Sequence, residues 1–458
     1  SLPIDEELDL DRLDGEIDVV YDDRGMPHIY GTTIHDLLLV EGYLMSRDRF
    51  AEMEFIRRNV LGRLAEVAGS LSPSLLEDDF DNRINGYARM GRRVWAALEA
   101  STDPVDVQSR ENAQAFVDGI NQYIARTRTV PRGEEPSTRG SEAFDVIVGS
   151  PFYTDWEPAD IFALARFQAM ELSYDPGDDA GNSRALAAVL AAFPAGDPRH
   201  NMFLDLFGEL PARAVFTRDG FNDGTTSALA PDFRPRPELP PMMIPPTSTL
   251  DGARPFFDRM EARSARIGLG DEHRGSNNWI VGGSLTASGH PILSNDPHLA
   301  LISPGVWWYV HLNTARMGGE GNVDAEGVAF NGLPGIVLGF NRNIAWGATT
   351  TGYDVTDAYL EEITEGTGGA PDTVLFDADG DGDLSDATQV AIVTEMESVN
   401  FAGMPAPVVR PVEFVPHHGV IIPGSRQPVA GMPGRFTALS VRYTGFDVSN
   451  ELGFFVGL

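Results

Sequence analysis

The sequence contains no cysteine, which excludes both disulfide bonds and thiolate metal sites. It also lacks any run of about 18 uninterrupted apolar residues, the length that a membrane-spanning helix requires. Basic residues are few, since 34 Lys and Arg stand against 68 Asp and Glu and give a formal net charge of −34. A field of this sign disfavours nucleic acid and anionic membranes as partners. Three explanations of the charge remain open: solubility, a saline habitat and cation binding.

What is present is typical of a globular protein. The 458 residues are enough for two or three ordinary domains or one large one. Apolar residues make up 42% of the chain and charged residues 22%, which is the usual balance for a packed core with a solvated surface. Residues 1–7 lack a basic region followed by an apolar one, so we do not expect them to be a signal peptide.

The predicted regular structure changes along the chain from helices to strands. Two β-rich runs within 17–30 predict a hairpin, and apolar residues at a spacing near 3.6 predict a helix over 36–69 with Gly69 as its C-cap. Further helices are predicted at 84–100, 106–127, 158–172 and 182–193. Short β-rich runs follow at 279–284, 305–314, 327–331, 335–340, 373–376, 389–394, 407–415, 419–422 and 436–443.

A proline-rich stretch separates the two halves. Residues 231–255 have little periodicity, and such long segments are normally functional loops, linkers or disordered. Soon after it, Gly275 and Ser276 precede the β-rich run. On its own this junction has two interpretations. It is either a turn that leads into a strand, or a self-cleavage site that leaves Ser276 as a new N-terminal nucleophile.

Six segments, taken in order, resemble the penicillin acylase (penicillin amidase) family of N-terminal-nucleophile hydrolases. They include Asp-Arg-Gly-Met-Pro-His-Ile-Tyr (23–30), which is similar to the opening strand motif of the family, and Gly-Ser-Asn-Asn-Trp (275–279), which is similar to its processing site. The others are 42–66, with Gly-Tyr, Asp-Arg-Phe, Met-Glu and Gly-Arg-Leu-Ala-Glu; Ser-Asn-Asp-Pro-His-Leu (294–299); Asn-Gly-Leu-Pro-Gly (331–335); and Gly-Phe-Asn-Arg-Asn-Ile-Ala-Trp-Gly (339–347).

The resemblance implies an α+β fold, the four-layer αββα sandwich of N-terminal-nucleophile hydrolases. It also implies a zymogen that cuts itself before Ser276. The expected organisation is an α-subunit-like helical region at 1–215, a removable spacer at 216–275 and the first part of a β-subunit-like region at 276–458. The product would be an αβ heterodimer in the bacterial periplasm or outside the cell. A remaining C-terminal part of the β region is expected to lie beyond this sequence.

Freeing the amine of Ser276 would supply the base that a serine nucleophile needs. A serine hydroxyl is a weak nucleophile until a base takes its proton, and a free α-amine has a pKa of about 7.7 to 8.0. While Gly275 is attached, the same nitrogen is an amide and cannot act as a base. We expect Gly275 to suit cleavage because glycine tolerates backbone conformations that other residues do not.

The resemblance assigns further roles around this nucleophile. The backbone N–H of Thr350 would donate to the oxyanion, although 349–351 also fits an ordinary threonine-rich turn. His298 would contact the nucleophile and the scissile amide as an orienting group, with a purely structural histidine as the alternative. Leu299 would line the acyl pocket, whereas 307–309 are expected in the core. A second oxyanion donor, an Asn with an Arg near it, is expected beyond residue 458.

Two segments are candidate calcium sites, and no organic cofactor is expected. Asp354, Thr356 and Asp357 are similar to a calcium-binding turn of the family, with Asp179 as a partner from the first half; a solvated acidic turn is the alternative. Separately, a loop similar to an EF-hand begins at residue 377 but has Thr388 at its twelfth position, where such loops use Glu. We expect weak Ca²⁺ binding there, by Asp377, Asp379 and Asp381.

The predicted activity is that of an amidohydrolase, an acylase that cleaves the linear amide of a small N-acyl substrate. The acyl compound would be a penicillin or cephalosporin antibiotic, an acyl-homoserine lactone or a lipopeptide. By the resemblance, relatives that act on acyl-homoserine lactones, cephalosporins and lipopeptides tend to have His at the position of His298, where others have Gln, so the resemblance favours a long-chain acyl substrate over penicillin G. The competing hypothesis is a catalytically inactive or unprocessed calcium-binding or interaction fragment of the same fold.

Overall fold

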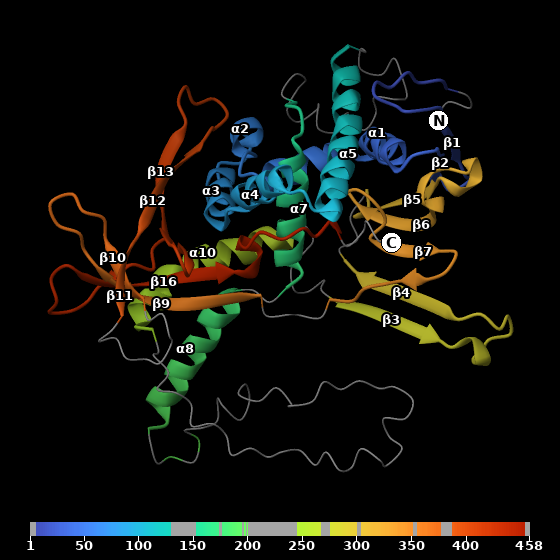
Figure 1. Ribbon diagram of the computed structural model, residues 1–458. Coiled ribbons are helices and arrows are strands. Elements are labelled where there is room, and N and C mark those ends of the chain that lie inside the picture. Colours follow the sequence, from blue (N-terminus) through green and yellow to red (C-terminus); the bar gives the residue numbers. More distant parts are fainter. Residues whose placement is uncertain are drawn as a thin grey trace.

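The computed structural model describes residues 6–129, 153–173, 176–194, 197, 199, 245–266, 275–299, 304–350, 355–376 and 387–453. Within these ranges, helices predominate up to residue 266 and strands from residue 275 onward (Figure 1). The α+β class and the predicted order, a helix-rich region before a β-rich region, are therefore confirmed. No helix of the described ranges is long and apolar enough to cross a membrane.

The N-terminal hairpin joins a sheet that is otherwise built by the second half of the chain. β1 (Asp18–Tyr21) pairs antiparallel with β2 (Pro27–Tyr30), which confirms the hairpin predicted within 17–30. β2 then pairs in parallel with β5 (Trp307–Asn313). The six-stranded order is β1-β2-β5-β6-β7-β8, completed by β6 (Asp324–Phe330), β7 (Leu338–Asn341) and β8 (Ala345–Trp346).

The helix predicted over 36–69 is divided in two. α1 (Ile34–Val60) begins at Thr33, whose Oγ1 accepts a hydrogen bond from the backbone N–H of Asp36 at 3.1 Å, and it is followed by α2 (Ala65–Ala68). The chain turns at Gly62, which has a φ of +62°, a left-handed conformation that favours glycine. Gly69 is the C-cap residue of α2, as predicted, with a right-handed φ of −59°.

A second glycine separates the next pair of helices. α3 (Leu75–Asn85) ends at Gly86, which has a φ of +76°, and α4 (Tyr87–Ala100) begins directly after it. The three remaining predictions in this region hold to within a few residues. They are α5 (Pro104–Thr129), α7 (Pro158–Glu171) and α8 (Pro176–Ala192).

One helix lies where the sequence predicted little regular structure. α10 (Thr247–Arg266) buries the side chains of Leu250, Phe256 and Met260. The prediction failed because Pro255 stands inside this helix, and an interior proline normally argues against one. The packing of α10 is that of a core element. The spacer boundaries of 216–275 stay a prediction, since 216–244 and 267–274 lie outside the described residues.

A larger sheet contains the remaining strands of the second half. Its order is β11-β10-β9-β16-β14-β13-β12, with β15 paired to β16. The nine residues of β9 pair with β16 along their whole length, although the sequence analysis did not predict β9 as a strand. The bounds are β9 (Thr356–Thr364), β10 (Thr373–Phe376), β11 (Thr388–Ala391), β12 (Val393–Val399), β13 (Val408–Val415), β14 (Gly419–Ile421), β15 (Gln427–Pro428) and β16 (Arg435–Tyr443). The stacking into four αββα layers stays a prediction.

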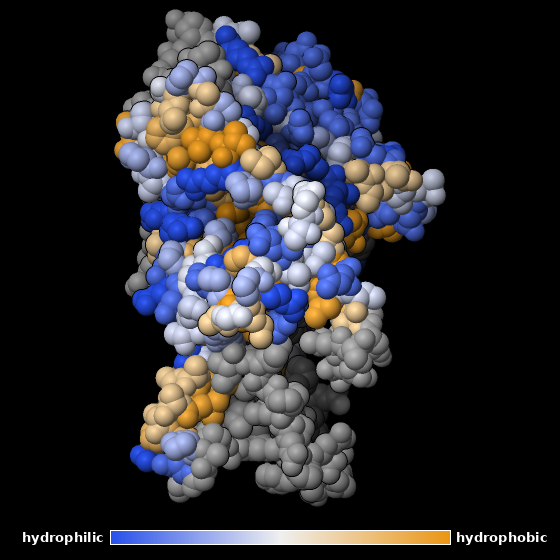
Figure 2. Space-filling model, turned by 90° about the vertical axis from the view of Figure 1, so that its left-hand side faces the viewer, coloured by the Kyte–Doolittle hydropathy of each residue, from blue (hydrophilic) through white to orange (hydrophobic). Residues whose placement is uncertain are grey.

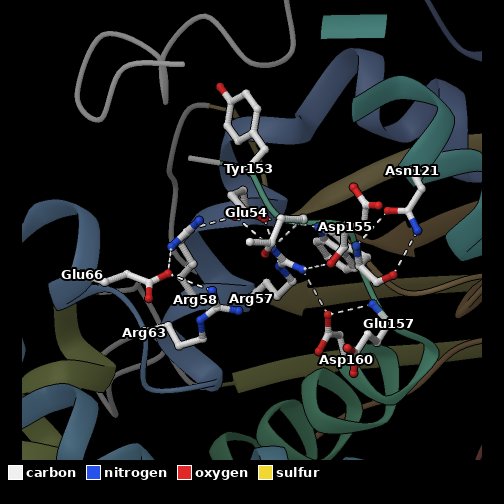
Figure 3. Close-up of polar contacts among 12 residues, drawn as sticks. Glu54, Arg57, Arg58, Arg63, Glu66, Asn121, Tyr153, Asp155, Glu157 and Asp160 are labelled. Atoms are coloured by element: carbon white, nitrogen blue, oxygen red, sulfur yellow. Dashed lines mark hydrogen bonds and ion pairs between the residues drawn. The ribbon is translucent and has the colours of Figure 1, made fainter. Parts of the chain in front are cut away.

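The helical core contains charged side chains as well as apolar ones. Glu54, Arg57 and Arg58 of α1 are each at most 1% exposed. Figure 3 shows Glu54 between the two guanidinium groups, with Nη2 of Arg57 at 3.0 Å and Nε of Arg58 at 2.7 Å. Each buried charge is therefore paired, as a low-dielectric interior requires. On the side of the molecule shown in Figure 2, hydrophilic side chains cover much of the described surface and apolar ones gather in separate patches.

Candidate active site

Ser276 lies in a strand and not in the turn that its composition first suggests. β3 (Gly275–Val281) pairs antiparallel with β4 (Ile292–His298) in a two-stranded sheet of its own. The register places Gly275 opposite His298 and Ser276 opposite Pro297. The strand predicted from residue 279 therefore starts four residues earlier (279 − 275), at the proposed scissile bond.

The alternation of side chains divides this hairpin into two faces. Successive residues of a strand point to opposite sides, and cross-strand partners share a side. Ser276 therefore shares a face with Pro297 and Asn295. His298 lies on the other face, together with Gly275. The backbone register thus separates the side chain of the predicted nucleophile from that of the predicted orienting histidine.

The hydroxyl of Ser276 already lies against the peptide group that would be cleaved. Its Oγ donates a hydrogen bond to the carbonyl oxygen of Gly275 at 2.5 Å. Gly275 is in a strand without a positive φ, so backbone freedom is not what this position requires here. Space is the better reason for glycine, because a Cβ at this position would lie 3.1 Å from Nδ1 of His298.

His298 has two polar neighbours on its own face. Its Nε2 lies 3.1 Å from Oδ2 of Asp296 and 3.2 Å from Nδ2 of Asn277. A carboxylate only accepts hydrogen bonds, so the contact with Asp296 requires the proton on Nε2; Nδ2 of Asn277, itself a donor, is then a neighbour and not a hydrogen-bond partner. Nδ1 is then an acceptor that faces Gly275. The arrangement suits a residue that positions the scissile peptide, and about half of the His298 side chain (48%) remains exposed.

Asn295 joins the segment after β8 to the face that carries Ser276. Its Nδ2 donates to the carbonyl of Ala348 at 2.9 Å, and its Oδ1 accepts from the N–H of Ala348 at 3.2 Å. Gly347 allows this approach, since a Cβ there would lie 2.8 Å from the Asn295 side chain. Thr350, the predicted oxyanion donor, lies two residues after Ala348 and is half-buried. Sequence reasoning did not assign a role to Asn295.

The predicted pocket and core residues near the hairpin take different positions. Leu299 follows β4, is half-buried and packs against the main hydrophobic core. Trp308 is buried, in agreement with the core position predicted for it, whereas Trp307 is only half-buried and stacks on Phe330 with ring centroids 4.3 Å apart. Tyr309 is 60% exposed, so the same prediction is wrong for that residue. Strand alternation explains the difference, because Tyr309 points away from the side of Trp308.

The structure shows one contact at the first calcium candidate, the segment of Thr356 and Asp357 with Asp179. Asp179 of α8 accepts a hydrogen bond from the backbone N–H of Ala358 in β9, at 3.2 Å from its Oδ2. The sequence paired Asp179 with Thr356 and Asp357 from the opposite half of the chain, and the structure brings it to that segment. Thr356 is buried and Asp357 is exposed, whereas Asp354 lies outside the described residues. Calcium itself stays a prediction.

The second calcium candidate cannot be placed. Asp377, Asp379 and Asp381 all lie outside the described residues. The strands on either side, β10 and β11, pair antiparallel. An EF-hand is flanked by helices, so the setting differs from that motif.

Another cluster in the described ranges has possible metal-binding atoms, those of Asp14, His35 and Asp36. Both carboxylate oxygens of Asp36 are already used, since they accept from the backbone N–H groups of Asp14 and Gly15 at 2.9 and 3.1 Å. The cluster therefore works as a clamp between the N-terminal segment and α1.

The sequence model of the family described as Penicillin amidase matches residues 16–457. Among curated relatives, the acyl-homoserine lactone acylase QuiP of Pseudomonas aeruginosa is 28% identical over 344 residues, covering 74% of this chain and 33% of the relative. Penicillin G acylase of Escherichia coli is 26% identical over 366 residues, covering 76% of this chain and 40% of the relative. The penicillin acylase 2 proenzyme of Pseudomonas sp. strain SE83 is 26% identical over 376 residues, with coverages of 79% and 40%.

This chain thus spans between 33% and 40% of the length of these three relatives. Among solved structures, a thermostable penicillin G acylase from Alcaligenes faecalis is 19% identical, with a TM-score of 0.33. That similarity covers 44% of this chain and 97% of the other.

Proposed function

The chain belongs to the penicillin amidase family of N-terminal-nucleophile hydrolases, and from this premise we propose that it hydrolyses the linear amide bond of N-acyl compounds. Ser276 is the nucleophile, and self-cleavage before it frees the α-amine that acts as its base. The observation that carries the proposal is the position of Oγ of Ser276, 2.5 Å from the carbonyl oxygen of Gly275.

Processing follows from that contact. Oγ gives up its proton and adds to the carbonyl carbon of Gly275, the bond from that carbon to the nitrogen of Ser276 breaks, and the nitrogen takes up the proton that Oγ lost to become the free amine. Water then hydrolyses the ester that has formed, which leaves a carboxylate on Gly275 and restores the hydroxyl of Ser276. His298, on the paired strand β4 and on the same face as Gly275, positions this peptide.

Turnover uses the same hydroxyl on a second carbonyl group. The freed amine takes the proton of Oγ through a bridging water, and Oγ adds to the carbonyl carbon of the substrate. The α-amine then returns this proton to the substrate nitrogen, the C–N bond breaks and the amine product leaves. Water hydrolyses the acyl-enzyme and releases the acid. The N–H of Thr350 donates to the oxyanion of each addition. This role is supported by the Asn295 contact, which holds the chain two residues before Thr350 against the face of Ser276.

The substrate is a small N-acyl molecule, and the proposed product of processing is an αβ heterodimer in the bacterial periplasm or outside the cell. Relatives are named for penicillin G and for acyl-homoserine lactones. His298 leads us to propose a long-chain acyl group in preference to phenylacetyl. Comparing the rates at which the two acids are released from matched amides tests this choice, and faster release of phenylacetate would overturn it.

Replacement of the nucleophile tests the chemistry directly. Ser276→Ala should abolish both cleavage of the chain and hydrolysis of N-acyl amides. Ser284→Ala is the matched control, because Ser284 is an exposed serine in the turn of the same hairpin. It should process and turn over normally. Cleavage that survives in Ser276→Ala would refute the assignment.

The alternative is an inactive calcium-binding or interaction fragment of the same fold. Its support is the contact between Asp179 and β9 beside Asp357. A chain that stays whole, hydrolyses no N-acyl amide and gains thermal stability on addition of Ca²⁺ would favour this alternative.

A further inference from the structure

A cavity of about 420 Å³ lies at the end of α1, away from the hairpin of Ser276 in sequence and in structural elements. Its walls come from the turn after α1, the junction of α3 and α4, the segment that precedes α7, and β12. Arginines are the most frequent residue type among those that line it, namely Arg57, Arg63, Arg83, Arg89 and Arg92. The chain contains no lysine, so all 34 of its basic residues are arginines. Five of them meet at this one cavity.

The arginines of this cavity have hydrogen-bond donors to spare. Nη1 of Arg83 donates to Glu397 at 3.1 Å and its Nε to the carbonyl of Gly62 at 3.0 Å, which leaves Nη2. Within the described residues the side chain of Arg63 makes one hydrogen bond, from Nη2 to Glu66 at 2.9 Å. A guanidinium carries five N–H donors in a planar fork. Unused donors therefore remain on both side chains.

Arg92 supplies the strongest indication of a ligand. It is exposed on α4, and it makes no hydrogen bond or ion pair with any residue in the described ranges. Arg89, one turn earlier on the same helix, pairs with Glu395 at 2.7 Å. Since Arg92 lines the same cavity without a counter-charge, an anion in the cavity would be its partner.

Glycine at the α3–α4 junction makes room for this arginine wall. A Cβ on Gly86 would lie 2.6 Å from Nη2 of Arg89, and the φ of Gly86 is +76°. A Cβ on Gly62 would lie 2.7 Å from Cγ of Arg83. Both positions have left-handed backbone that side chains rarely adopt, so the two arginines lie directly against the main chain.

Two of the acidic residues on the opposite wall are already engaged. Asp160 accepts from Nη1 of Arg57 at 3.1 Å (Figure 3), and Asp155 accepts from Arg128 at 2.9 Å. Glu157, the N-cap residue of α7, accepts from the backbone N–H of Asp160 through its own backbone carbonyl at 2.8 Å, and its side chain is exposed. Asp155 and Asp160 are therefore committed to their own partners, and Glu157 alone can offset only part of the positive charge that lines the cavity.

We propose that this cavity is a binding site for a small multivalent oxyanion, held by the side chains of Arg63, Arg83, Arg89 and Arg92. Guanidinium forks match phosphate and carboxylate oxygens in bidentate geometry. The overall charge of −34 repels such a ligand at long range. At physiological ionic strength that repulsion is screened beyond about 8 Å, so the arginines at contact distance decide binding.

Calorimetric titration of the full chain with tripolyphosphate and, separately, with citrate tests the proposal and distinguishes a phosphate from a carboxylate ligand. The variants are Arg92→Gln and the double variant Arg63→Gln with Arg92→Gln. Arg93→Gln is the matched control, because Arg93 is the exposed neighbour on the same helix but does not line the cavity. Thermal melting of each variant checks that the fold is retained.

Saturable binding of either anion by the unaltered chain and by Arg93→Gln is expected. Arg92→Gln should bind about tenfold more weakly, and the double variant more weakly still, because each lost guanidinium removes charge-assisted hydrogen bonds. No saturable binding of either anion would overturn the proposal, and so would equal affinity in all four proteins. Neither result depends on cleavage at Ser276. A failure of the anion-binding proposal can therefore be distinguished from a failure of the proposed function.

Discussion

At the scale of single residues, the hairpin places Ser276 and His298 on opposite faces, although the sequence analysis had expected their side chains to be in contact. Ser276 shares its face with Asn295, whereas His298 shares the other face with Gly275. The side chain of His298 therefore lies beside Gly275 of the proposed scissile peptide and not beside Ser276, the proposed nucleophile. This position agrees with the orienting role that we propose for His298, and Asn295 ties the strand pair to the segment before Thr350.

Asn295 gives the first residue-scale prediction. Asn295→Ala removes both hydrogen bonds to Ala348 and releases the segment that carries Thr350, the proposed oxyanion donor. Because small misplacements of such donors are costly, we expect kcat/KM for an N-acyl amide to fall about 10- to 100-fold. Ser294→Ala, at an exposed position next to it on β4, is the control and should turn over normally. Unchanged kinetics in Asn295→Ala would contradict the proposal that the hydrogen bonds between Asn295 and Ala348 position Thr350.

Glu41 gives a prediction for the dependence of stability on pH. This side chain of α1 is buried, and burial raises the pKa of its carboxyl to about 8, although the backbone N–H of Gly335 donates to it and opposes the shift. A raised folded-state pKa means that the protonated form stabilises the fold. Its stability contribution is complete below the unfolded pKa of about 4.3 and is lost as the pH rises through about 8.

The free energy of unfolding of Glu41→Gln should therefore increase relative to that of the unaltered protein as the pH rises from 5 to 9. The difference in free energy of unfolding should move in favour of the variant by a few kcal/mol, since one pKa unit corresponds to about 1.4 kcal/mol. Urea unfolding at each pH measures it. Glu99→Gln, at an exposed position on α4, should show no such trend. A difference for Glu41→Gln that is independent of pH would contradict the argument.

At the scale of elements, periodic segments were predictable and exceptions had local causes. The hairpin within 17–30 and the helices α5, α7 and α8 follow from patterning that packing does not contradict. The division at Gly62 was missed because an apolar period continues across this left-handed residue, whereas α3, which ends at Gly86, was not predicted as a helix. β9 was missed because its acidic residues suggested a calcium turn, and α10 because of Pro255. The candidate site was located only through ordered motifs, since Gly275-Ser276 alone suggests a turn.

α10 supplies the prediction at this scale. Phe256 is 1% exposed within the helix that was expected to belong to a spacer. Phe256→Ala should lower the free energy of unfolding by about 3–5 kcal/mol, because it leaves a cavity in a packed core. Arg254→Ala, at an exposed position on the same helix, should cost much less. Chemical denaturation of both variants measures the difference, and equal, small losses would mean that α10 does not belong to the core.

At the scale of the whole molecule, the two halves of the chain share a sheet and pack against each other. β2 pairs with β5, and α10 packs close enough to β15 and the turn before it that Gly252 must be a glycine, since a Cβ there would lie 2.1 Å from the carbonyl oxygen of Gly424. Processing should therefore leave both fragments associated. α10 should stay with the N-terminal fragment after gel filtration, and peptide mapping of that fragment should recover residues 247–266. Their loss would support excision of the whole 216–275 spacer instead.

Self-cleavage before Ser276 is the central claim, and the intact mass of the purified protein with N-terminal sequencing tests it most directly. We predict two polypeptides that co-purify, one of which begins at Ser276. A single stable chain of 49.7 kDa, or a fragment that begins at any other residue, would contradict it.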